Sequence, residues 1–393
     1  MNDVHSGSIE LRLPSTDGSL STYRLTGEPL PIAKPARAFN RVAFAAAHVV
    51  ADPFTAVEPS DKPVLDWPRT IAYRRYLIGL GLGVAEAMDT AQRGMGLDWH
   101  GALELIGRTL AETRDLPDAL IFSGCGTEQL DPADARTIDD VIAAYLTQMH
   151  AIQKLGGRII LMASRALARV ARSPEDYRKV YARVLSEADQ PVILHWLGDM
   201  FDPALAGYWG GDRFEETVET ALGVIAENAA KVDGIKISLL DDAKEIAMRR
   251  RLPAGVKMYS GDDFNYPELI AGDAHGYSHA LLGIFDAIAP AASSALAALA
   301  AGDRARYDAL LAPTVPLSRL IFRAPTRFYK TGVVFLSYLN GHQDHPIMVG
   351  GQQGMRPLPY FCEIFKLADQ AGLLADPADA TARMRRFLAF YGV

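Results

Sequence analysis

The feature that most constrains the fold is a motif that repeats along the chain: a short apolar run, a polar loop and an amphipathic helix. Continuous runs of Val, Ile and Leu are typical of parallel strands buried on both faces. Eight runs occur, at residues 42–47, 83–88, 118–122, 158–162, 191–195, 232–237, 256–259 and 275–280. No glycine-rich phosphate loop follows the first run, so the repeat predicts a closed (β/α)8 TIM barrel of the α/β class rather than an open sheet.

Two appendages flank the predicted barrel. Apolar and polar residues alternate over residues 8–26 around the turn sequence Thr16–Ser19, which predicts a β-hairpin. Helical patterns continue after the eighth unit for longer than one helix requires. We therefore predict three segments: residues 1–40 as an N-terminal hairpin and connector, residues 41–290 as the barrel, and residues 291–393 as a C-terminal helical extension packed on the barrel.

Composition narrows the range of partners. The 393 residues are 49% hydrophobic and 22% charged, with a net charge of −7, which excludes a disordered chain and gives no electrostatic case for nucleic acid. No apolar stretch approaches the roughly 20 residues that span a bilayer, and the N-terminus has no signal-peptide pattern. Two cysteines cannot form a disulfide framework. We expect a cytoplasmic protein with a small-molecule partner and no cofactor.

The ends of the predicted strands carry the candidate chemistry, because barrel active sites lie at the carboxyl ends of the strands. Lys236 lies between Ile235 and Ile237 in the sixth run. If the isoleucines pack on helices, Lys236 points into the barrel, where desolvation lowers the pKa of a lysine and frees its amine to attack a carbonyl. A structural lysine paired with a carboxylate such as Asp241 is the alternative.

Further polar residues end other runs. Asp262 and Asp263 follow the seventh run, where paired carboxylates can hold a polar substrate or a proton, although Ser-Gly-Asp-Asp is also ordinary loop and N-cap sequence. Ser123, Ser164 and His279 are assigned to the ends of the third, fourth and eighth runs as pocket-lining residues.

The order of these features resembles the dihydrodipicolinate synthase and N-acetylneuraminate lyase superfamily of Schiff-base aldolases. The resemblance covers roughly residues 40–325 and is most specific from Ile235 to Phe322, where Gly-Ile-Lys is followed by SGDD and then by GDAHGYSHALLGIFDAIAPAAS. In that superfamily the lysine of the sixth strand condenses with a keto group, and Lys236 occupies this place. The resemblance implies an imine on Lys236 and assembly into a homodimer or homotetramer.

The chain also departs from the superfamily pattern. The Gly-Thr-Thr-Gly-Glu loop after strand two is replaced by a stretch in which only Thr90 survives and Asp89 is an added acid. The tyrosine that ends the fifth strand is replaced by His195, followed by Trp196, and an imidazole can move protons near neutral pH. An acidic loop repels the carboxylate of pyruvate, so we expect a neutral, sugar-derived keto substrate rather than dihydrodipicolinate synthesis.

Two other classes stay open. Histidines and carboxylates that converge at a barrel mouth, with His48, Asp89 and His195 as the set, can bind Zn²⁺ or Mn²⁺ as in metal-dependent sugar isomerases and epimerases. A non-catalytic sugar-binding barrel is the third possibility, against which a buried lysine counts. The hypothesis is a class I aldolase or related lyase in which Lys236 forms the imine, His195 moves protons, and Asp89, Thr90, Asp262 and Asp263 position hydroxyl groups.

Overall fold

The computed structural model describes residues 9–32, 34–35, 38–58 and 62–393. Part of the predicted connector, residues 33 and 36–37, lies outside the described residues, as do residues 1–8 and 59–61. In the described part of the chain, no helix is long and apolar enough to cross a membrane.

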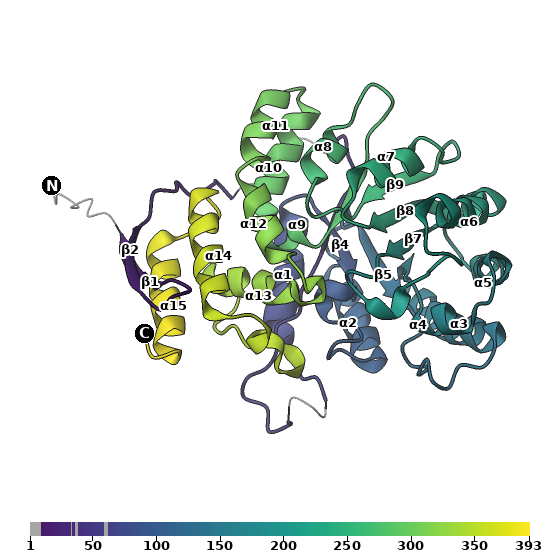
Figure 1. Ribbon diagram of the computed structural model, residues 1–393, viewed down its shortest axis with the longest axis horizontal. Coiled ribbons are helices and arrows are strands. Elements are labelled where there is room, and N and C mark those ends of the chain that lie inside the picture. The colour runs from purple at the N-terminus through teal and green to yellow at the C-terminus, as the bar shows by residue number, and fades with distance from the viewer. Residues whose placement is uncertain (1–8, 33, 36–37, 59–61) are drawn as a thin grey trace.

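Eight parallel strands close into a barrel in the order β10-β3-β4-β5-β6-β7-β8-β9, which confirms the predicted (β/α)8 class (Figure 1). Two strands, β5 and β10, begin a few residues further along the chain than predicted. The strands are β3 (Ala43–Ala46), β4 (Gly83–Glu86), β5 (Ile121–Cys125), β6 (Arg158–Leu161), β7 (Val192–Leu197), β8 (Val232–Ser238), β9 (Lys257–Ser260) and β10 (His279–Leu282).

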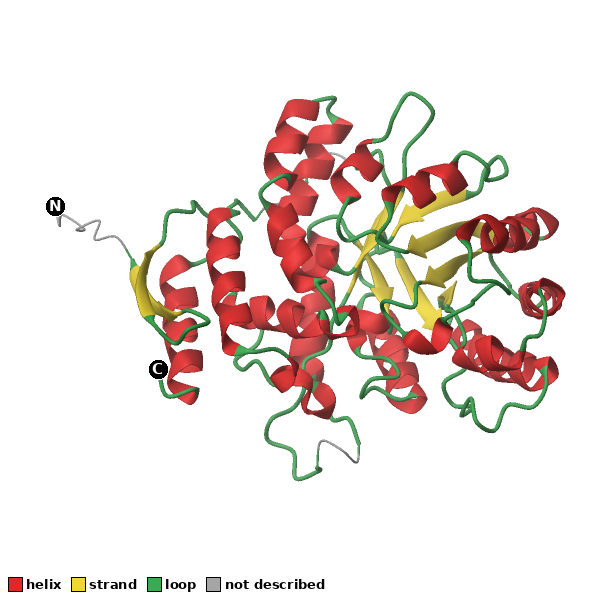
Figure 2. Cartoon of the chain, viewed as in Figure 1, coloured by secondary structure: helices red, strands yellow, loops and turns green. Residues whose placement is uncertain are grey.

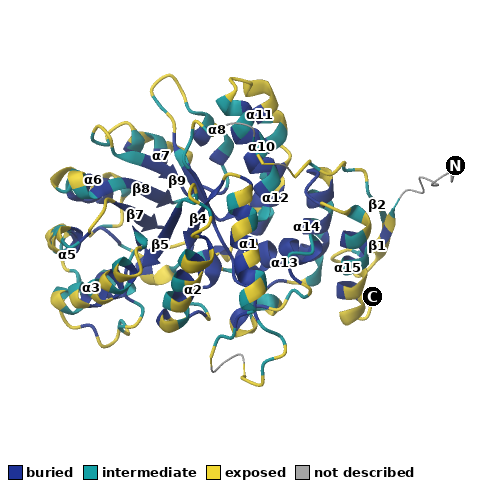
Figure 3. Cartoon of the chain, turned by 180° about the vertical axis from the view of Figure 1, so that it is seen from behind, coloured by how far each residue is buried: buried dark blue, intermediate teal, exposed yellow. Residues whose placement is uncertain are grey.

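Helices surround the strands, which are buried on both faces (Figures 2 and 3). Local sequence fixes several helix starts: Thr137 and Asp140 form a capping box that begins α3. The barrel helices are α1 (Trp67–Gly79), α2 (Trp99–Glu112), α3 (Ile138–Lys154), α4 (Arg165–Val170), α5 (Pro174–Ser186), α6 (Phe214–Glu227), α7 (Asp242–Arg249), α8 (Tyr266–Ala271) and α9 (Ile284–Ala287), with the short 3-10 helices η1 (Asp89–Ala91), η2 (Pro203–Leu205) and η3 (Ala229–Lys231).

The barrel interior is apolar at its amino-terminal end. Alternate residues of the strands point inward, and Phe44, Phe122, Ile160, Ile193 and Tyr259 belong to one inner cluster. The rings of Phe44 and Phe122 meet edge to face with centroids 5.3 Å apart. Because this cluster fills the floor, polar inward-facing residues have room only at the mouth, where the carboxyl ends of the strands meet.

The segment after the barrel is helical, as predicted, and carries the N-terminal hairpin. Its helices are α10 (Ala289–Ala300), α11 (Arg304–Leu311), α12 (Thr314–Ile321), η4 (Thr326–Phe328), α13 (Lys330–Leu339), η5 (Val349–Met355), α14 (Leu358–Gln370) and α15 (Pro377–Phe390). The hairpin, β1 (Glu10–Pro14) and β2 (Leu20–Arg24), packs on α14, where Tyr23 donates a hydrogen bond of 2.8 Å to Asp369. Figure 1 shows α14, α15 and the hairpin farthest from the barrel strands.

Candidate active site

Lys236 points into the barrel, as strand alternation predicts. Its neighbours Ile235 and Ile237 belong to the core cluster shared with the helices, so Lys236 takes the opposite face of β8 and is 7% exposed. Gly261, just after β9, makes space for the lysine: a Cβ at this position would lie 2.8 Å from Lys236 Cε. A Cβ would lie even closer to Ser238 Oγ, and 2.7 Å from the Ile237 carbonyl oxygen, so the glycine of the Ser-Gly-Asp-Asp sequence is required by its close contact with β8.

His195 lies next to Lys236 on the adjoining strand. The two residues are register partners in β7 and β8, and His195 is fully buried. Its Nε2 lies 3.3 Å from Ser238 Oγ, and its Nδ1 has no hydrogen-bond partner among the described residues. Desolvation, and then the charge of Lys236, lower the pKa of His195 well below 6.5. The imidazole is therefore neutral at neutral pH and able to accept a proton.

Two carboxylates act on Lys236. Burial lowers the pKa of the Lys236 amine, and the charges of Asp89 and Asp263 oppose that shift without cancelling it. Asp263 accepts a hydrogen bond of 2.8 Å from the Ile284 amide, and burial raises its pKa to about 7. A carboxyl group with this pKa can give or take a proton near neutrality.

Asp262 does not share the environment of Asp263. Its Oδ1 accepts hydrogen bonds from the Phe264 and Asn265 amides at 2.8 and 3.0 Å, and its Oδ2 accepts a third from the Asn265 side chain. These bonds form a local Asx turn, in agreement with the loop interpretation of the sequence. Asp262 therefore shapes the loop that places Asp263.

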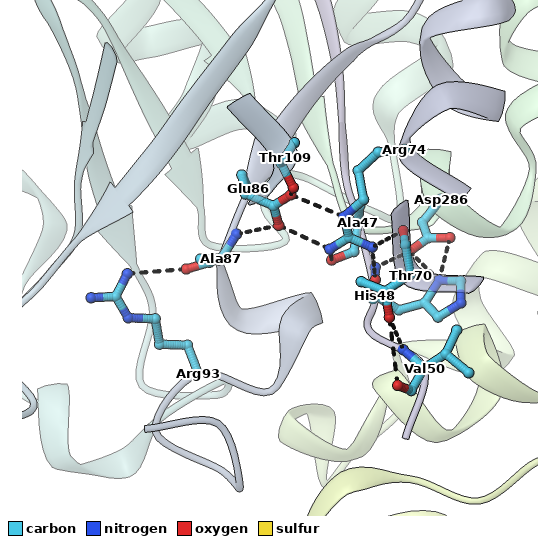
Figure 4. Close-up of polar contacts among 10 residues, drawn as sticks. All are labelled: Ala47, His48, Val50, Thr70, Arg74, Glu86, Ala87, Arg93, Thr109 and Asp286. Carbon is cyan, nitrogen blue, oxygen red and sulfur yellow. Dashed lines mark hydrogen bonds and ion pairs between the residues drawn. The ribbon is translucent and has the colours of Figure 1, made fainter. Parts of the chain in front are cut away.

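A buried charge network fixes the loop after β4, residues 87–97, which we call the mouth loop (Figure 4). Arg74 on α1 makes a two-point ion pair with Glu86, at 2.8 and 2.9 Å, and both side chains are 0% exposed. Glu86 also accepts a hydrogen bond from the amide N–H of Ala87. The φ of Ala87 is 51°, which is strained for a residue with a Cβ. The ion pair therefore holds the turn that brings Asp89 to the barrel mouth.

A cavity of about 100 Å³ opens beside His195. It is bordered by the segments that follow β4, β5, β6 and β7, and its charged residues form two ion pairs, Arg93 with Glu128 and Arg165 with Asp202, each at 2.5 Å. The polar and charged residues that line it are Asp89, Arg93, Thr127, Glu128, Arg165, His195 and Asp202. Neither arginine is among the residues predicted from the sequence, although Arg165 lies just after the fourth apolar run.

The C-terminal extension also reaches the mouth, which the sequence did not predict. The Tyr329 hydroxyl lies 2.8 Å from Thr90 Oγ1, and both residues are buried. The next residue, Lys330, is 3% exposed and has a pKa lowered to about 8, chiefly by burial. No local sequence signal marks this pair, since 239 residues separate Tyr329 from Thr90.

Three predicted pocket residues lie elsewhere. Trp196 follows the inward-facing His195 and faces outward, where it stacks on Phe214 of α6 with ring centroids 5.8 Å apart. His279 begins β10 rather than ending it, so it lies at the floor, where its Nδ1 accepts the Val42 amide at 2.9 Å. Ser123 lies within β5 on the face opposite the inward-pointing Phe122. These corrections follow from where β5, β7 and β10 begin and end.

Ser164 lies behind the cavity wall. Its Oγ caps α4 by accepting the Leu167 amide at 3.0 Å and lies 2.6 Å from Thr127 Oγ1. Ser164 is 1% exposed, whereas Thr127 lines the cavity. Ser164 therefore supports a cavity-lining hydroxyl and does not itself form the wall.

The alternative metal ligands are not brought together. The described residues contain no group of three or more His, Cys, Asp or Glu side chains placed to hold a metal ion. His48 is paired with Asp286 on α9, with Nδ1 2.9 Å from the carboxylate (Figure 4). The ring of Tyr73 packs on the His48 ring. The set of His48, Asp89 and His195 is therefore wrong as a ligand set.

Comparison with known proteins places the chain in a family. Residues 11–393 match the family described as "Protein of unknown function (DUF993)". The chain belongs to this family. A comparison with curated proteins finds no match.

Solved structures resemble this DUF993 chain over most of its length. YagE from E. coli K12, a prophage protein of the dihydrodipicolinic acid synthase family in complex with pyruvate, gives a TM-score of 0.65 at 15% identity over 86% of this chain and 100% of that chain. Dihydrodipicolinate synthase from Aquifex aeolicus gives 0.63 at 11% over 85% and 99%, and that from Acinetobacter baumannii gives 0.62 at 17% over 85% and 99%. The fold resemblance predicted from the sequence is confirmed.

Proposed function

We propose that this protein is a class I aldolase or related lyase that forms a Schiff base between Lys236 and a sugar-derived keto substrate. The observation that carries the proposal is a desolvated lysine inside the barrel, beside a neutral histidine and a carboxyl group of raised pKa. A fold shared with dihydrodipicolinate synthases supports the same class. The lowered pKa of Lys236 increases the fraction of free amine that can attack a carbonyl.

The residues around Lys236 fit the steps of imine chemistry. The amine nitrogen attacks the keto carbon, the carbonyl oxygen takes a proton, and loss of that oxygen as water leaves a C=N bond to Lys236. Protonated, this imine draws electrons from the adjacent carbon, so that a C–C or C–H bond there can break. His195 and Asp263 supply and remove the protons, and Asp89 and Thr90 hold substrate hydroxyl groups.

The charges of the cavity support a neutral substrate. Its lining contains three acids, Asp89, Glu128 and Asp202, and two arginines. Each arginine is already paired with an acid, Arg93 with Glu128 and Arg165 with Asp202, so Asp89 is the one acid in the cavity lining without an arginine partner among the described residues. A substrate carboxylate would meet net negative charge here, whereas hydroxyl groups can donate hydrogen bonds to the acids. We therefore propose a hydroxylated keto compound in place of pyruvate.

Borohydride trapping tests this proposal. The protein is incubated with pyruvate, 2-keto-3-deoxy sugar acids and neutral keto sugars, reduced, and analysed by intact mass and peptide mapping. We expect one adduct, on Lys236, with a neutral keto sugar as the best donor. The Lys236→Ala variant is the control and should give none. An adduct with pyruvate alone would contradict the substrate class, and no adduct with any donor would contradict the Schiff-base proposal.

The resemblance also implies assembly into a homodimer or homotetramer, and we keep this as a proposal. Sedimentation velocity on the purified chain distinguishes these states from a monomer. A monomer that still forms the Lys236 adduct would separate the catalytic proposal from the oligomeric one.

A further inference from the structure

The C-terminal extension covers one side of the barrel mouth with an aromatic ring. Tyr329, directly before α13, is 3% exposed, and its ring stacks on Phe322 with centroids 4.4 Å apart at 15°. It meets Phe201 edge to face at 6.1 Å. Gly283, at the end of β10, supports the ring closely: a Cβ at this position would lie 3.2 Å from a ring atom of Tyr329. The ring therefore rests on the carboxyl end of the barrel.

Two acids at the barrel mouth influence both the Tyr329 hydroxyl and the amine of Lys236. Asp89 and Asp263 act electrostatically on both side chains. The hydroxyl also lies 2.8 Å from Thr90 Oγ1, so Tyr329 holds the threonine that follows Asp89. Burial raises the pKa of Tyr329, so the phenol stays protonated, and either hydroxyl of the Tyr329–Thr90 pair can be the donor.

The two sides of the barrel mouth differ, because one side contains a cavity and the other is covered by the Tyr329 ring. The cavity beside His195 is lined by residues of β7 and of the segments that follow β4, β5, β6 and β7, and none of its lining residues comes from the extension. Tyr329 occupies the side next to β10 instead. His195, the register partner of Lys236, lines the cavity, whereas the Tyr329 ring lies on the other side of the mouth, against Gly283.

We propose that Tyr329 is a specificity-determining residue whose ring limits the length of the carbonyl compound that can react at Lys236. Its hydroxyl also positions Thr90 toward the bound substrate. The inference rests on the proposed Schiff-base function, because it concerns access to the same amine. The extension then completes, within one chain, a site whose reactive residues come from the barrel.

Reductive alkylation measures access to Lys236 without knowledge of the natural substrate. The protein is treated with cyanoborohydride and straight-chain aldehydes from formaldehyde to hexanal. Each aldehyde forms an imine with loss of water, and hydride reduces it to a secondary amine that peptide mapping assigns to Lys236. In wild type we expect the rate at Lys236 to fall steeply with chain length. Tyr329→Ala should react with the longer aldehydes about 10-fold or more faster, the size of effect expected for a cleared apolar pocket.

Three variants separate the ring from the hydroxyl and from the fold. Tyr329→Phe keeps the ring, so it should keep the length limit and lose about 10-fold in kcat with the donor found by trapping, the value of one lost hydrogen bond. Tyr329→Leu keeps more packing and is used if the alanine variant unfolds. Tyr338→Phe is the matched control, because Tyr338 lies on α13, which begins directly after Tyr329, and its hydroxyl donates to the Arg383 carbonyl at 2.9 Å.

The outcomes distinguish the two proposals. If folded Tyr329→Ala and Tyr329→Leu show the wild-type dependence on chain length, the specificity role is overturned while the Schiff-base proposal stands. If Lys236 in wild type fails to react even with formaldehyde, the amine is not accessible and both proposals fall. If Tyr338→Phe changed the chain-length dependence or kcat as much as the Tyr329 variants do, the assignment would also be overturned, because the effect would then come from a general loosening of α13.

Discussion

The two buried lysines near the barrel mouth, Lys236 and Lys330, differ in what surrounds the amine. Both carry a pKa lowered by burial, and Asp89 acts on both. Lys236 extends from β8 into the barrel beside His195. Lys330 begins α13 in the extension, and its Nζ donates to the Arg327 carbonyl at 3.2 Å and to Met95 Sδ at 3.4 Å.

The pKa alone does not choose between these amines. That of Lys330 falls to about 8, so it too supplies free amine at neutral pH. Placement decides, because imine formation needs a proton carrier and room for a carbonyl, and Lys236 lies beside His195, which lines a cavity. A lowered lysine pKa therefore shows that the amine is buried, whereas the groups around the amine determine whether it can form an imine.

The largest expected effect separates the two lysines directly. Lys236→Ala should lose on the order of 10⁶-fold in kcat, the size of loss seen when an enzyme nucleophile is removed. It should stay folded, since it removes a buried amine that costs desolvation energy. Lys330→Ala, the matched variant, should keep more than a tenth of the activity. Turnover and thermal melting of both variants check this, and the opposite order would reverse the roles of the two lysines.

Replacement of His195 tests the neighbour that distinguishes Lys236. His195→Gln should lower kcat by about 10²–10⁴-fold, as expected for loss of a general acid–base. Because the pKa of His195 lies well below 6.5, the wild-type rate should show no inflection from this residue near pH 6.5. Ser238→Ala, which removes the hydroxyl 3.3 Å from Nε2, is the control for a lost hydrogen bond. Full activity in His195→Gln would assign the proton transfers to Asp263 alone.

The barrel strands and the direction of Lys236 can largely be predicted from the sequence. Apolar runs locate the strands, and alternation along Ile235, Lys236 and Ile237 gives the direction of the lysine. Trp196 and His279 are misplaced because each depends on a strand end, and a shift of a few residues moves a side chain to another face or to the floor. Tyr329 is out of reach, since its contact with Thr90 joins segments 239 residues apart.

A smaller effect concerns the cost of burying Lys330. An unfolded lysine has a pKa of about 10.4, and the folded value is about 8. Between these two pKa values the unfolded chain binds more protons than the folded chain, so the free energy of unfolding rises with pH through this window. Below pH 8 the lysine is charged in both states, and the full cost of burying the charge is present. At about 1.4 kcal/mol for each pKa unit, the gain is about 3 kcal/mol.

Lys330→Met should lack that gain. Urea unfolding of wild type and variant at pH 8 and at pH 10.4 measures it, and the difference between the two proteins cancels contributions from other groups. Lys244→Met is the control, because Lys244 is 42% exposed on α7 and should give no such difference. If the free energy of unfolding changed equally with pH in wild type and in Lys330→Met, the folded pKa of Lys330 would not be lowered.

The smallest effect tests how the extension holds the mouth loop. Gln352 donates to the Met95 carbonyl at 2.7 Å, and Gln92 donates to the Val349 carbonyl at the same distance. Gln352→Ala should cost about 1 kcal/mol, the value of one hydrogen bond. Hydrogen exchange should become faster in the mouth loop and stay unchanged in the barrel strands. The exposed Gln190→Ala is the control, and unchanged exchange in the mouth loop would show that the extension does not restrain it.

The most direct experiment determines which lysine carries the substrate. Wild type, Lys236→Ala and Lys330→Ala are each reduced with borohydride in the presence of the best keto donor, and peptide mapping locates the added mass. We expect an adduct on Lys236 in wild type and in Lys330→Ala, and none in Lys236→Ala. An adduct on Lys330, or none in wild type with any donor, would contradict the assignment of Lys236 as the Schiff-base lysine.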